Sequence, residues 1–433
     1  MFRQSGVIRT DTLEEMFDVA SLLANQPLPK GNRVAIVTNA GGPGILAADA
    51  CEAKGLLLAQ LSASTVAKLR EILPAAASVG NPIDMIASAS GDQYRKTLEL
   101  VLADSGVDAV IAVYIPVLPT EAAAVAASIR DCTATAQGKT VLATFMSAGS
   151  APPLHPVPAF PFPERAVNAL AMATRYAAWR RAPVGNAVTF DDLDLAALRS
   201  IVESALERGG GWLDPIDTAN LLAATRLEAP VTRLARSADD AMEAAMCIGF
   251  PVALKAWGPE LLHKSDVGGV KLSLVDESRV IAAYEGLSTA LGERMTGAVV
   301  QAMVPGGVEM MIGATRDPAF GHVIAVGAGG TLVELLEDVA FRICPLLDTD
   351  PAEMLGQLRV ARLLRGFRGS KPADVAALHT AISRVSALLE LCPEIAELDI
   401  NPIKVTDSGA IAVDARIRVE APPAVVPSRR VIY

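Results

Sequence analysis

Apolar and polar positions follow two different patterns along the chain, and the first pattern occupies its N-terminal part. Short apolar runs at Val34–Val37, Leu56–Leu61, Ala109–Ile115 and Thr140–Phe145 alternate there with alanine-rich helical stretches. Strands that alternate with helices in this way predict a parallel α/β sheet with right-handed crossovers. Residues 12–25 predict one more helix, ahead of this sheet.

The second pattern lies beyond a stretch rich in proline, glycine and acidic residues, and it predicts an α+β unit. Its strands are expected at residues 251–254, 268–274, 298–304, 308–314, 322–326, 396–402 and 410–419, and its helices at residues 352–364 and 373–391. We divide the chain into a helical tail (1–29), a parallel-sheet domain (30–181), a linker (182–211), a second domain (212–420) and a C-terminal tail (421–433).

Composition narrows the classes of protein that fit these patterns. The 433 residues carry a net charge of −10, which argues against a basic surface for nucleic acid. The apolar runs are much shorter than the roughly 18–20 residues that cross a bilayer, and no export signal precedes the first helix. The five cysteines are widely spaced and form no CxxC pair. We therefore expect a cytoplasmic globular protein without a membrane or nucleic-acid partner.

The first chemical motif is the turn after Val34–Val37, which reads Asn39-Ala40-Gly41-Gly42-Pro43-Gly44. Unpaired amides at a helix N-terminus attract anions, and glycines allow the backbone to approach a phosphate closely. The motif has neither the GxGxxG spacing of dinucleotide folds nor the GKS or GKT of a P-loop. By itself, this motif slightly favours a plain strand-to-helix turn over a phosphate loop.

The second motif places a lysine at the end of a buried strand, and a histidine soon after it. Lys255 ends the run Pro251–Leu254, and a buried lysine is costly unless it meets an anion, so we consider it a contact for nucleotide phosphates. His263 and Lys264 precede a Gly-Gly turn, where an imidazole would suit transient phosphorylation. The alternatives are a strand-end lysine in solvent and an idle loop histidine.

The third motif, from Val299 to Glu309, reads as two strands joined by Gly306-Gly307. Its backbone amides at Ala302–Val304 are candidates to meet an adenine edge, with Glu309 directed at the ribose or at a metal. As a bare pattern it predicts a β-hairpin.

The fourth motif is a polar row on an otherwise apolar strand. Alternation places Glu397, Asp399 and Asn401 on one face, and Asp414 falls in the next strand. Carboxylate and amide oxygens suit Mg²⁺, which shares its remaining positions with nucleotide phosphates. A purely structural origin would bury carboxylates to no purpose, so we favour a metal site.

Together these motifs resemble the NDP-forming (ADP-forming) acyl-CoA synthetases, which are related to succinyl-CoA synthetase. The resemblance covers nearly the whole chain. It implies a flavodoxin-like ligase domain followed by an ATP-grasp domain, with residues 2–17 similar to the end of a preceding domain. The matching segments are NAGGPG (39–44), GNPIDM (80–85), FPFPERAV (160–167), LLHKSDVGGV (261–270), VPGGVE (304–309) and ELDINP (397–402).

The resemblance implies the reaction of a carboxylate, CoA and ATP to acyl-CoA, ADP and phosphate through an acyl phosphate and a phosphohistidine. ATP or ADP and Mg²⁺ are the implied cofactors, and CoA is a substrate. The implied sites are a catalytic group (His263, Lys264, Asp266), a nucleotide site (Lys255, Gln301, Ala302, Met303, Val304, Glu309, Arg342), a phosphate loop (Asn39, Gly41, Gly42, Gly44) and metal ligands (Asp399, Asn401, Asp414). Gly327–Gly330 and Glu334 resemble the lid and phosphate-side wall.

The family's CoA-binding domain and its principal phosphohistidine, in a Ser-His-Thr-Gly segment, have no counterpart in the sequence. We therefore expect a CoA-binding partner subunit or a homo-oligomer. Two other hypotheses stay open: a nucleotide-binding regulatory remnant, and an ATP-grasp carboxylate ligase that uses a different nucleophile.

Overall fold

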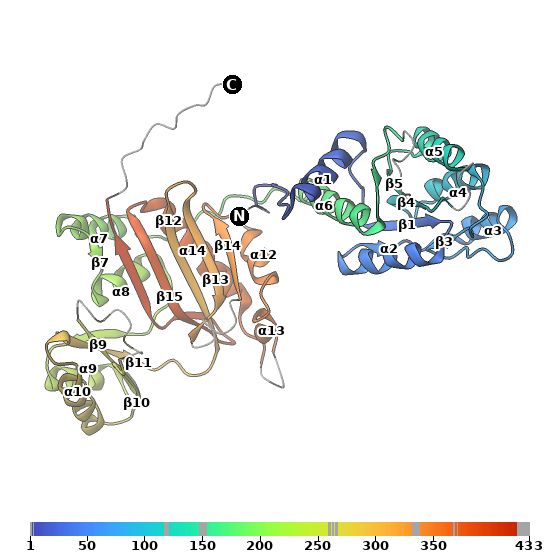
Figure 1. Cartoon of the computed structure of the whole chain (residues 1–433). Helices are drawn as coiled ribbons and strands as arrows, with labels where there is room; N and C mark the ends of the chain where they lie inside the picture. Colours follow the sequence, from blue (N-terminus) through green and yellow to red (C-terminus); the bar gives the residue numbers. More distant parts are fainter. Residues whose placement is uncertain are drawn as a thin grey trace. The chain divides into compact units, whose positions relative to one another are not determined.

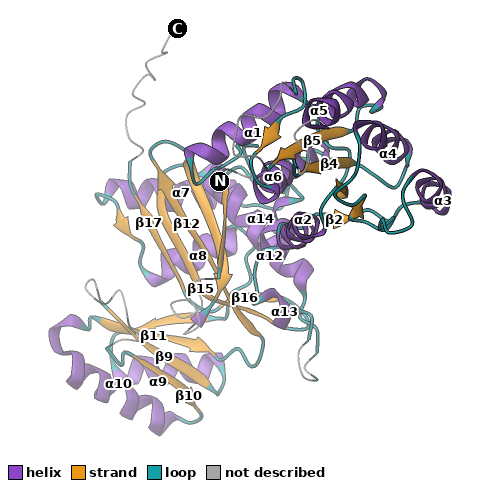
Figure 2. Ribbon diagram, turned by 45° about the vertical axis from the view of Figure 1, so that its right-hand side comes forward, coloured by secondary structure: helices purple, strands orange, loops and turns teal. Residues whose placement is uncertain are grey.

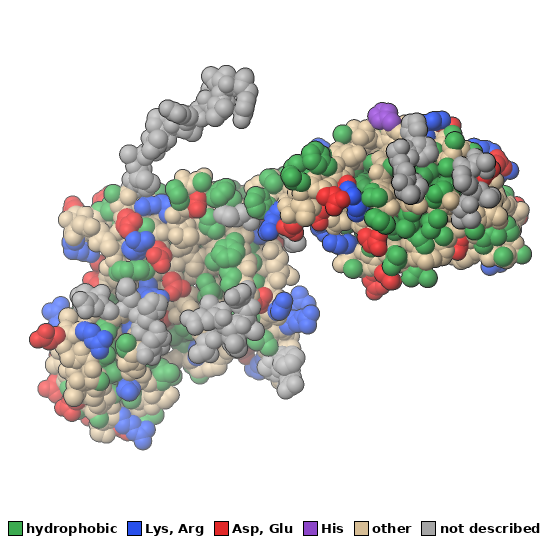
Figure 3. All heavy atoms as spheres, in the orientation of Figure 1, with side chains coloured by type: hydrophobic (Ala, Val, Ile, Leu, Met, Phe, Trp, Pro, Cys, Tyr) green, Lys and Arg blue, Asp and Glu red, His purple; other side chains and the backbone are tan. Residues whose placement is uncertain are grey.

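The computed structural model describes residues 2, 4–116, 121–146, 154–258, 261, 264, 267–330, 338–366, 369 and 371–421, without the side chains of 134 and 135. It divides into an N-terminal unit, Phe2–Pro183, and a C-terminal unit that starts at Val184 (Figure 1). Among the described residues, no helix combines the length and the apolar character that crossing a bilayer requires. Acidic and basic side chains are interspersed over the face drawn in Figure 3.

The N-terminal unit is a parallel sheet with helices on both faces, as predicted. The strand order is β2-β1-β4-β5-β6, and β3 also pairs with β1. Its strands are β1 (Arg33–Thr38), β2 (Leu57–Leu58), β3 (Ile83–Asp84), β4 (Ala109–Tyr114), β5 (Thr140–Phe145) and β6 (Ala159–Phe160). Its helices are α1 (Leu13–Asn25), α2 (Gly41–Ala53), α3 (Ala63–Ile72), α4 (Gly91–Ala103), α5 (Ala122–Asp131), the 3₁₀ turn η2 (Cys132–Thr135) and α6 (Pro163–Arg181).

The alternation within β1 explains the two layers of helices. Val34 and Ile36 pack into a core with α1, α2 and α6, whereas Ala35 and Val37 pack into a core with α3, α4 and α5. Since successive side chains of a strand point to opposite faces, a strand that is apolar throughout must be covered on both sides. The expected strand at Leu56–Leu61 is wrong in its extent, because only Leu57 and Leu58 pair with β1.

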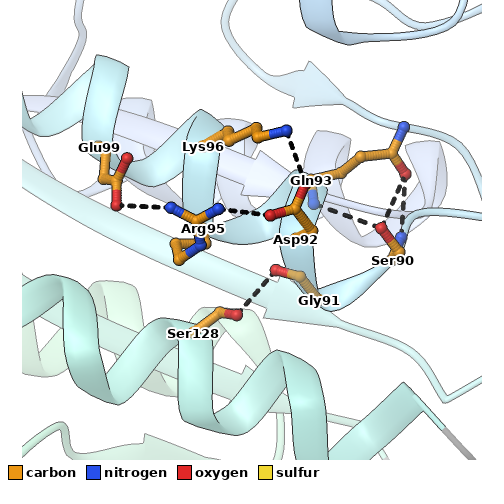
Figure 4. Close-up of polar contacts among 8 residues, drawn as sticks. All are labelled: Ser90, Gly91, Asp92, Gln93, Arg95, Lys96, Glu99 and Ser128. Atoms are coloured by element: carbon orange, nitrogen blue, oxygen red, sulfur yellow. Dashed lines mark hydrogen bonds and ion pairs between the residues drawn. The ribbon is translucent and has the colours of Figure 1, made fainter.

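Helix α4 shows how local sequence fixes an element of this unit (Figure 4). The Ser90 side chain accepts from the Gln93 N–H, while the Gln93 side chain accepts from the Ser90 N–H, which forms a capping box. The Ser128 hydroxyl of α5 donates to the Gly91 carbonyl at 2.7 Å. The start of α4 is therefore tied to its neighbouring helix.

The C-terminal unit contains two sheets (Figure 2). A four-stranded sheet has the order β10-β9-β11-β8, and a seven-stranded sheet has the order β14-β13-β12-β15-β17-β7 with β16 paired to β15. The strands are β7 (Gly211–Trp212), β8 (Thr232–Ala235), β9 (Val252–Trp257), β10 (Val270–Leu274), β11 (Gly297–Ala302), β12 (Val308–Asp317), β13 (Gly321–Ala328), β14 (Val339–Ile343), β15 (Ile395–Val405), β16 (Ala410–Ala412) and β17 (Ala415–Val419).

The helices of this unit pack mainly on one face of each sheet. Helices α9 and α10 share a core with the four-stranded sheet, and α7, α8, α12 and α14 share one with the seven-stranded sheet. The helices are α7 (Leu195–Glu207), α8 (Pro215–Ala224), α9 (Ala238–Ile248), α10 (Glu277–Leu291), η3 (Gly292–Arg294), α12 (Asp350–Gly356), α13 (Ala361–Leu364) and α14 (Val375–Leu391). The single helix expected at residues 352–364 is wrong, because α12 and α13 are separate.

The expected hairpin between Val299 and Glu309 is also wrong. Strand β11 pairs with β8 and β9, whereas β12 pairs with β13 and β15, so the two strands belong to different sheets. Gly306 and Gly307 have φ values of 63° and 86°, a conformation that glycine adopts without strain. The Gly-Gly pair therefore turns the chain from one sheet to the other.

Candidate functional site

A cavity of about 240 Å³ lies in the C-terminal unit, where elements of both sheets meet helix α8. Its charged lining consists of three cationic side chains and two carboxylates. They come from β9 (Lys255), the segment before β10 (Lys264), β17 (Arg416), the N-cap of α8 (Asp214) and the residue before β17 (Asp414). In a chain with a net charge of −10, an excess of cations around one cavity favours an anionic ligand.

Lys255 is the most unusual residue of the cavity because it is only 5% exposed. Its Nζ donates to the Val413 carbonyl at 2.8 Å and lies 3.5 Å from the Asp414 carboxylate. Burial lowers the pKa of Lys255, and the neighbouring Lys264 lowers that pKa further, whereas Asp414 raises it. The structure corrects one detail, since β9 continues to Trp257 and Lys255 lies within the strand.

Asp414 is the centre of the charges in the cavity. Its carboxylate lies 3.5 Å from the Lys255 Nζ and 3.7 Å from the Lys264 Nζ. Two cations around one carboxylate leave positive charge to be balanced by a ligand. Asp214, the second carboxylate of the cavity, caps helix α8 by accepting from the backbone N–H groups of Ile216 and Asp217.

The polar row on β15 exists as expected, but arginines on the next strand neutralise part of it. Glu397 and Asp399 stand directly opposite Arg418 and Arg416 of β17, at 3.4 Å and 3.0 Å. Asp399 is therefore already paired with a cation through its Oδ2 atom. Within the described ranges, no group of three or more His, Cys, Asp or Glu side chains lies close enough together to hold a metal ion by itself.

Asn401 and Asp414 fit a shared Mg²⁺ site better than Asp399 does. The Asn401 N–H donates to the Asp414 carbonyl at 3.0 Å, so the two residues are neighbours across the strands. The Asn401 Oδ1 accepts from the Gly330 N–H at 3.0 Å and keeps a second lone pair. One amide and one carboxylate suffice for Mg²⁺ where phosphates and water fill the other positions.

The expected adenine-binding segment, Gln301–Val304, lies only partly in the cavity. Gln301 lines the cavity, whereas Ala302–Val304 are not among its lining residues. The N–H groups of Ala302 and Met303 donate to the carbonyls of Val231 and Pro251, so these two amides are engaged within the protein.

The end of this segment, at Val304, is bonded to Lys404 of the seven-stranded sheet. Lys404 donates to the Val304 carbonyl at 3.0 Å, and its Nζ lies 3.8 Å from the carboxylate of Glu309. A Cβ on Gly330 would lie 2.2 Å from that carboxylate, so glycine is required for Glu309 to occupy this position. Glu309 thus lies close to Gly330, the partner of Asn401.

Arg342 has a different environment from the expected one. It is 5% exposed, and its guanidinium donates to Asp350 at 3.0 Å and to Glu353 at 3.1 Å. Both acids belong to α12, and Arg342 is not among the cavity's lining residues. The structure therefore ties Arg342 to the packing of α12 against β14.

His263, Asp266 and Glu334 lie outside the residues that the structure describes, while Lys264 is described and lines the cavity. Trp212, Trp257 and Arg416 are among the lining residues that were missed from the sequence. Arg416 follows Asp414 by two positions, but only the strand register shows that it faces Asp399.

The glycine-rich turn of the N-terminal unit lies where β1 passes into α2. This end of β1 lies between β3 and β4, at the point where the strand order reverses, which is a common place for ligands in parallel sheets. Asn39 is 1% exposed and exchanges two hydrogen bonds, of 2.8 and 2.9 Å, with the backbone of Ile115. Its amide thus joins β1 to β4 and has a structural reason to be there.

The glycines of this turn have different surroundings. A Cβ on Gly41 would lie 3.1 Å from the Asp84 carboxylate, and a Cβ on Gly44 would lie 3.0 Å from Thr38, whereas Gly42 faces open space. Helix α2 has no side-chain cap at Ala40. The start of α2 is open at Gly42, but a carboxylate stands beside it at Gly41.

The fold and the cavity define a protein class that combines a flavodoxin-like unit with a two-sheet unit built around a buried lysine. Comparisons with known proteins agree. Residues 34–151 match the Ligase-CoA domain, and residues 204–419 match the ATP-grasp domain. Acetate–CoA ligase (ADP-forming) I of Archaeoglobus fulgidus is 38% identical over 429 residues, which cover 96% of this chain and 61% of that protein.

Two further relatives are subunits of the ADP-forming acetate–CoA ligase II of Pyrococcus furiosus. Subunit beta is 36% identical over 50% of this chain and 95% of its own length, and subunit alpha is 48% identical over 34% of this chain and 32% of its own length. A solved structure of the acetyl-CoA synthetase 1 of Candidatus Korarchaeum cryptofilum, in complex with coenzyme A and Ca-AMPCP, has a TM-score of 0.50 at 37% identity and covers 51% of this chain and 99% of that one.

The chain belongs to the family of ADP-forming acyl-CoA ligases. It spans about three fifths of the length of the relative from Archaeoglobus fulgidus. Relatives in this family also occur as separate alpha and beta subunits.

Proposed function

We propose that the chain is the nucleotide-binding part of an ADP-forming acyl-CoA synthetase, which converts a carboxylate, CoA and ATP to acyl-CoA, ADP and phosphate. The cavity around the buried Lys255 carries this proposal, because a lysine that loses its hydration on folding regains stabilisation from a phosphate group. The relative from Candidatus Korarchaeum cryptofilum, in complex with Ca-AMPCP, supports a nucleotide as the ligand.

In this proposal the chain's own residues bind and orient the nucleotide. Lys255 and Lys264 neutralise charge on the phosphates, and Gln301 lines the floor of the cavity. Asn401 and Asp414 hold Mg²⁺, which when bound offsets the charge that develops on the phosphate oxygens. Phosphoryl transfer depends mainly on such positioning and charge neutralisation.

We propose His263 as the acceptor of the phosphoryl group, with Lys264 and Asp266 beside it. The bond from the γ-phosphorus to the ADP oxygen breaks, an N–P bond forms at the imidazole, and the imidazole releases its proton. We propose that the loop at Asn39, Gly41, Gly42 and Gly44 cradles the phosphate of a phosphohistidine. The acyl-CoA step then requires a CoA-binding subunit. We propose a cytoplasmic location, because a nucleotide and CoA are the proposed substrates.

Tryptophan fluorescence offers a direct test of nucleotide binding. Trp212 and Trp257 line the cavity, and the chain has three tryptophans in all. We expect ADP with Mg²⁺ to change the emission saturably, and Lys255→Met to weaken binding about 10–100-fold, as expected for loss of a hydrogen bond to a charged group. Lys271→Met, on the exposed edge strand β10, is the matched control and should bind like the wild type.

Incubation with Mg-ATP labelled at the γ-phosphate tests the transfer step. We expect an acid-labile, base-stable label that His263→Ala abolishes. Saturable binding without a label, alone or with a CoA-binding subunit, would favour a regulatory nucleotide-binding protein instead. Release of ADP that depends on a carboxylate but not on CoA would favour a ligase with another nucleophile.

A further inference from the structure

One face of the seven-stranded sheet carries a ladder of charges that ends at an aromatic ring. Glu397 and Asp399 of β15 stand opposite Arg418 and Arg416 of β17, and Arg418 stands opposite Trp212 of β7. Both guanidinium carbons lie 5.9 Å from the centre of the Trp212 ring. Such cation–π contacts restrict the orientation of a guanidinium as well as stabilising it.

The two arginines of this ladder have different surroundings. Arg416 lines the cavity together with Trp212, whereas Arg418 is absent from the cavity's lining residues. Arg416 donates from Nη2 to the Asp399 Oδ2 at 3.0 Å. Each pair is thus a cross-strand ion pair, but only the pair with Asp399 holds a cation in the cavity wall.

The pairing also bears on what Asp399 does. Its side chain is 27% exposed and that of Arg416 is 26% exposed, so the pair is partly shielded from water. An arginine presents five donor hydrogens in a planar fork, and a carboxylate bound at one edge fixes the direction of the others. The bond to Arg416 uses the Oδ2 atom of this carboxylate and directs that oxygen at the cavity wall.

We propose that Asp399 is a positioning residue, which holds Arg416 in the cavity wall so that the guanidinium contacts the phosphate chain of the nucleotide. Trp212 supports Arg416 from the neighbouring strand. This inference rests on the proposed nucleotide site, and it gives that site a third cation, beside Lys255 and Lys264. Asp399 thereby acts on the nucleotide through Arg416 and not through Mg²⁺.

The test measures ADP affinity in the absence of divalent cations, by tryptophan fluorescence and by calorimetry. Arg416→Gln should weaken binding about 10-fold, and Asp399→Asn should weaken it by about 3–10-fold. The double variant should bind no more weakly than Arg416→Gln alone, because Asp399 acts only through the arginine. Arg416→Lys should recover part of the affinity, since it keeps the charge but not the planar fork.

Glu397→Gln is the control, because Glu397 also forms a cross-strand ion pair, with Arg418 outside the cavity, and Arg418 keeps a second carboxylate partner in Glu420. It should bind ADP like the wild type, and thermal unfolding of every variant checks that the fold is kept. Calorimetry reports affinity independently of any change that the variants cause in Trp212 emission.

Three results would overturn the inference. One is an unchanged Mg²⁺-free affinity in Asp399→Asn together with a higher Mg²⁺ concentration for half-saturation, which indicates a metal ligand. Another is an additive loss in the double variant, and the third is an equal loss in Glu397→Gln. A wild-type chain that binds no ADP at all would instead contradict the proposed function itself.

Discussion

The two candidate anion-binding regions of this protein use different chemical groups, charged side chains in one and backbone amides in the other. The cavity of the C-terminal unit depends on charged side chains, above all on Lys255, which is 5% exposed. The turn before α2 in the N-terminal unit presents backbone instead, and the nearest charged group is the carboxylate of Asp84 beside Gly41. A buried cation next to a cavity needs an anion to justify its desolvation, whereas a glycine turn does not.

The difference helps to distinguish residues that indicate ligand binding from residues that stabilise the fold. Lys255 donates to the Val413 carbonyl, but together with Lys264 it also leaves positive charge beside the cavity. Asn39 and Arg342, by contrast, satisfy buried polar groups of their own unit. Substitutions at these residues should separate the two kinds, because one kind should change ADP binding and the other should change stability.

Arg342→Met should lower the free energy of unfolding by about 3–5 kcal/mol, because it leaves the buried Asp350 without its partner. The variant should still bind ADP with wild-type affinity wherever it remains folded. Chemical denaturation measures the first effect, and tryptophan fluorescence measures the second.

Arg279→Met is the control for this variant, since its ion pair with Asp276 is exposed and should contribute less than about 1 kcal/mol. A large loss of ADP affinity in folded Arg342→Met would instead support the original assignment of Arg342 to the nucleotide site.

Lys255 should make anion binding depend on pH in a way that an exposed lysine would not. Burial lowers the pKa of Lys255, so its charge is lost as the pH rises through a value below that of an ordinary lysine. ADP affinity should therefore weaken at alkaline pH, and binding there should take up protons, because the phosphate favours the charged form.

Calorimetry in two buffers of different ionisation enthalpy measures this uptake. Lys255→Arg keeps its charge over the whole range and should remove the alkaline weakening. If the arginine variant weakened with pH just as the wild type does, another group would be responsible.

Asn39→Ala should destabilise the N-terminal unit by about 1–3 kcal/mol, because two partly buried backbone groups of Ile115 lose their partner. Asn25→Ala, which removes an exposed hydrogen bond to Ser21, should cost much less. ADP binding in the other unit should be unchanged in both variants. Thermal unfolding that shows no loss for Asn39→Ala would leave its amide available for a ligand.

Much of the fold follows from the sequence because the long strands are buried on both faces or alternate cleanly. The runs at Ala109–Ile115 and Thr140–Phe145 confirm this, since they match β4 and β5 closely. The two-residue strands β3 and β6 have no such signal, because they exist only through pairing with β1 and β5. The local sequence pattern does not show which other strand will pair with such a short segment.

The site divides in the same way. The importance of Lys255 could be predicted from the sequence, because a charged side chain in an apolar strand is costly to bury without an anionic partner. The role of Asp399 could not, since it depends on the register that sets Asp399 opposite Arg416 of β17. Likewise, the Gly-Gly pair at Gly306–Gly307 indicates a turn, but only the sheets show that β11 and β12 are not partners.

The smallest expected effect concerns Gly42, the residue of the α2 turn that faces open space. Gly42→Ala introduces no close contact and should leave stability unchanged or raise it by up to about 1 kcal/mol, since alanine favours the helix. If the turn cradles a phosphate, the added methyl group obstructs the backbone, and acyl-CoA formation with a CoA-binding subunit should fall. Gly55→Ala does not serve as a control, because Gly55 has a φ of 79°, but Gly286→Ala in α10 does, since its Cβ would also meet nothing within 4 Å. Equal activity of the Gly42 and Gly286 variants would show that the turn is a connection between β1 and α2 and no more.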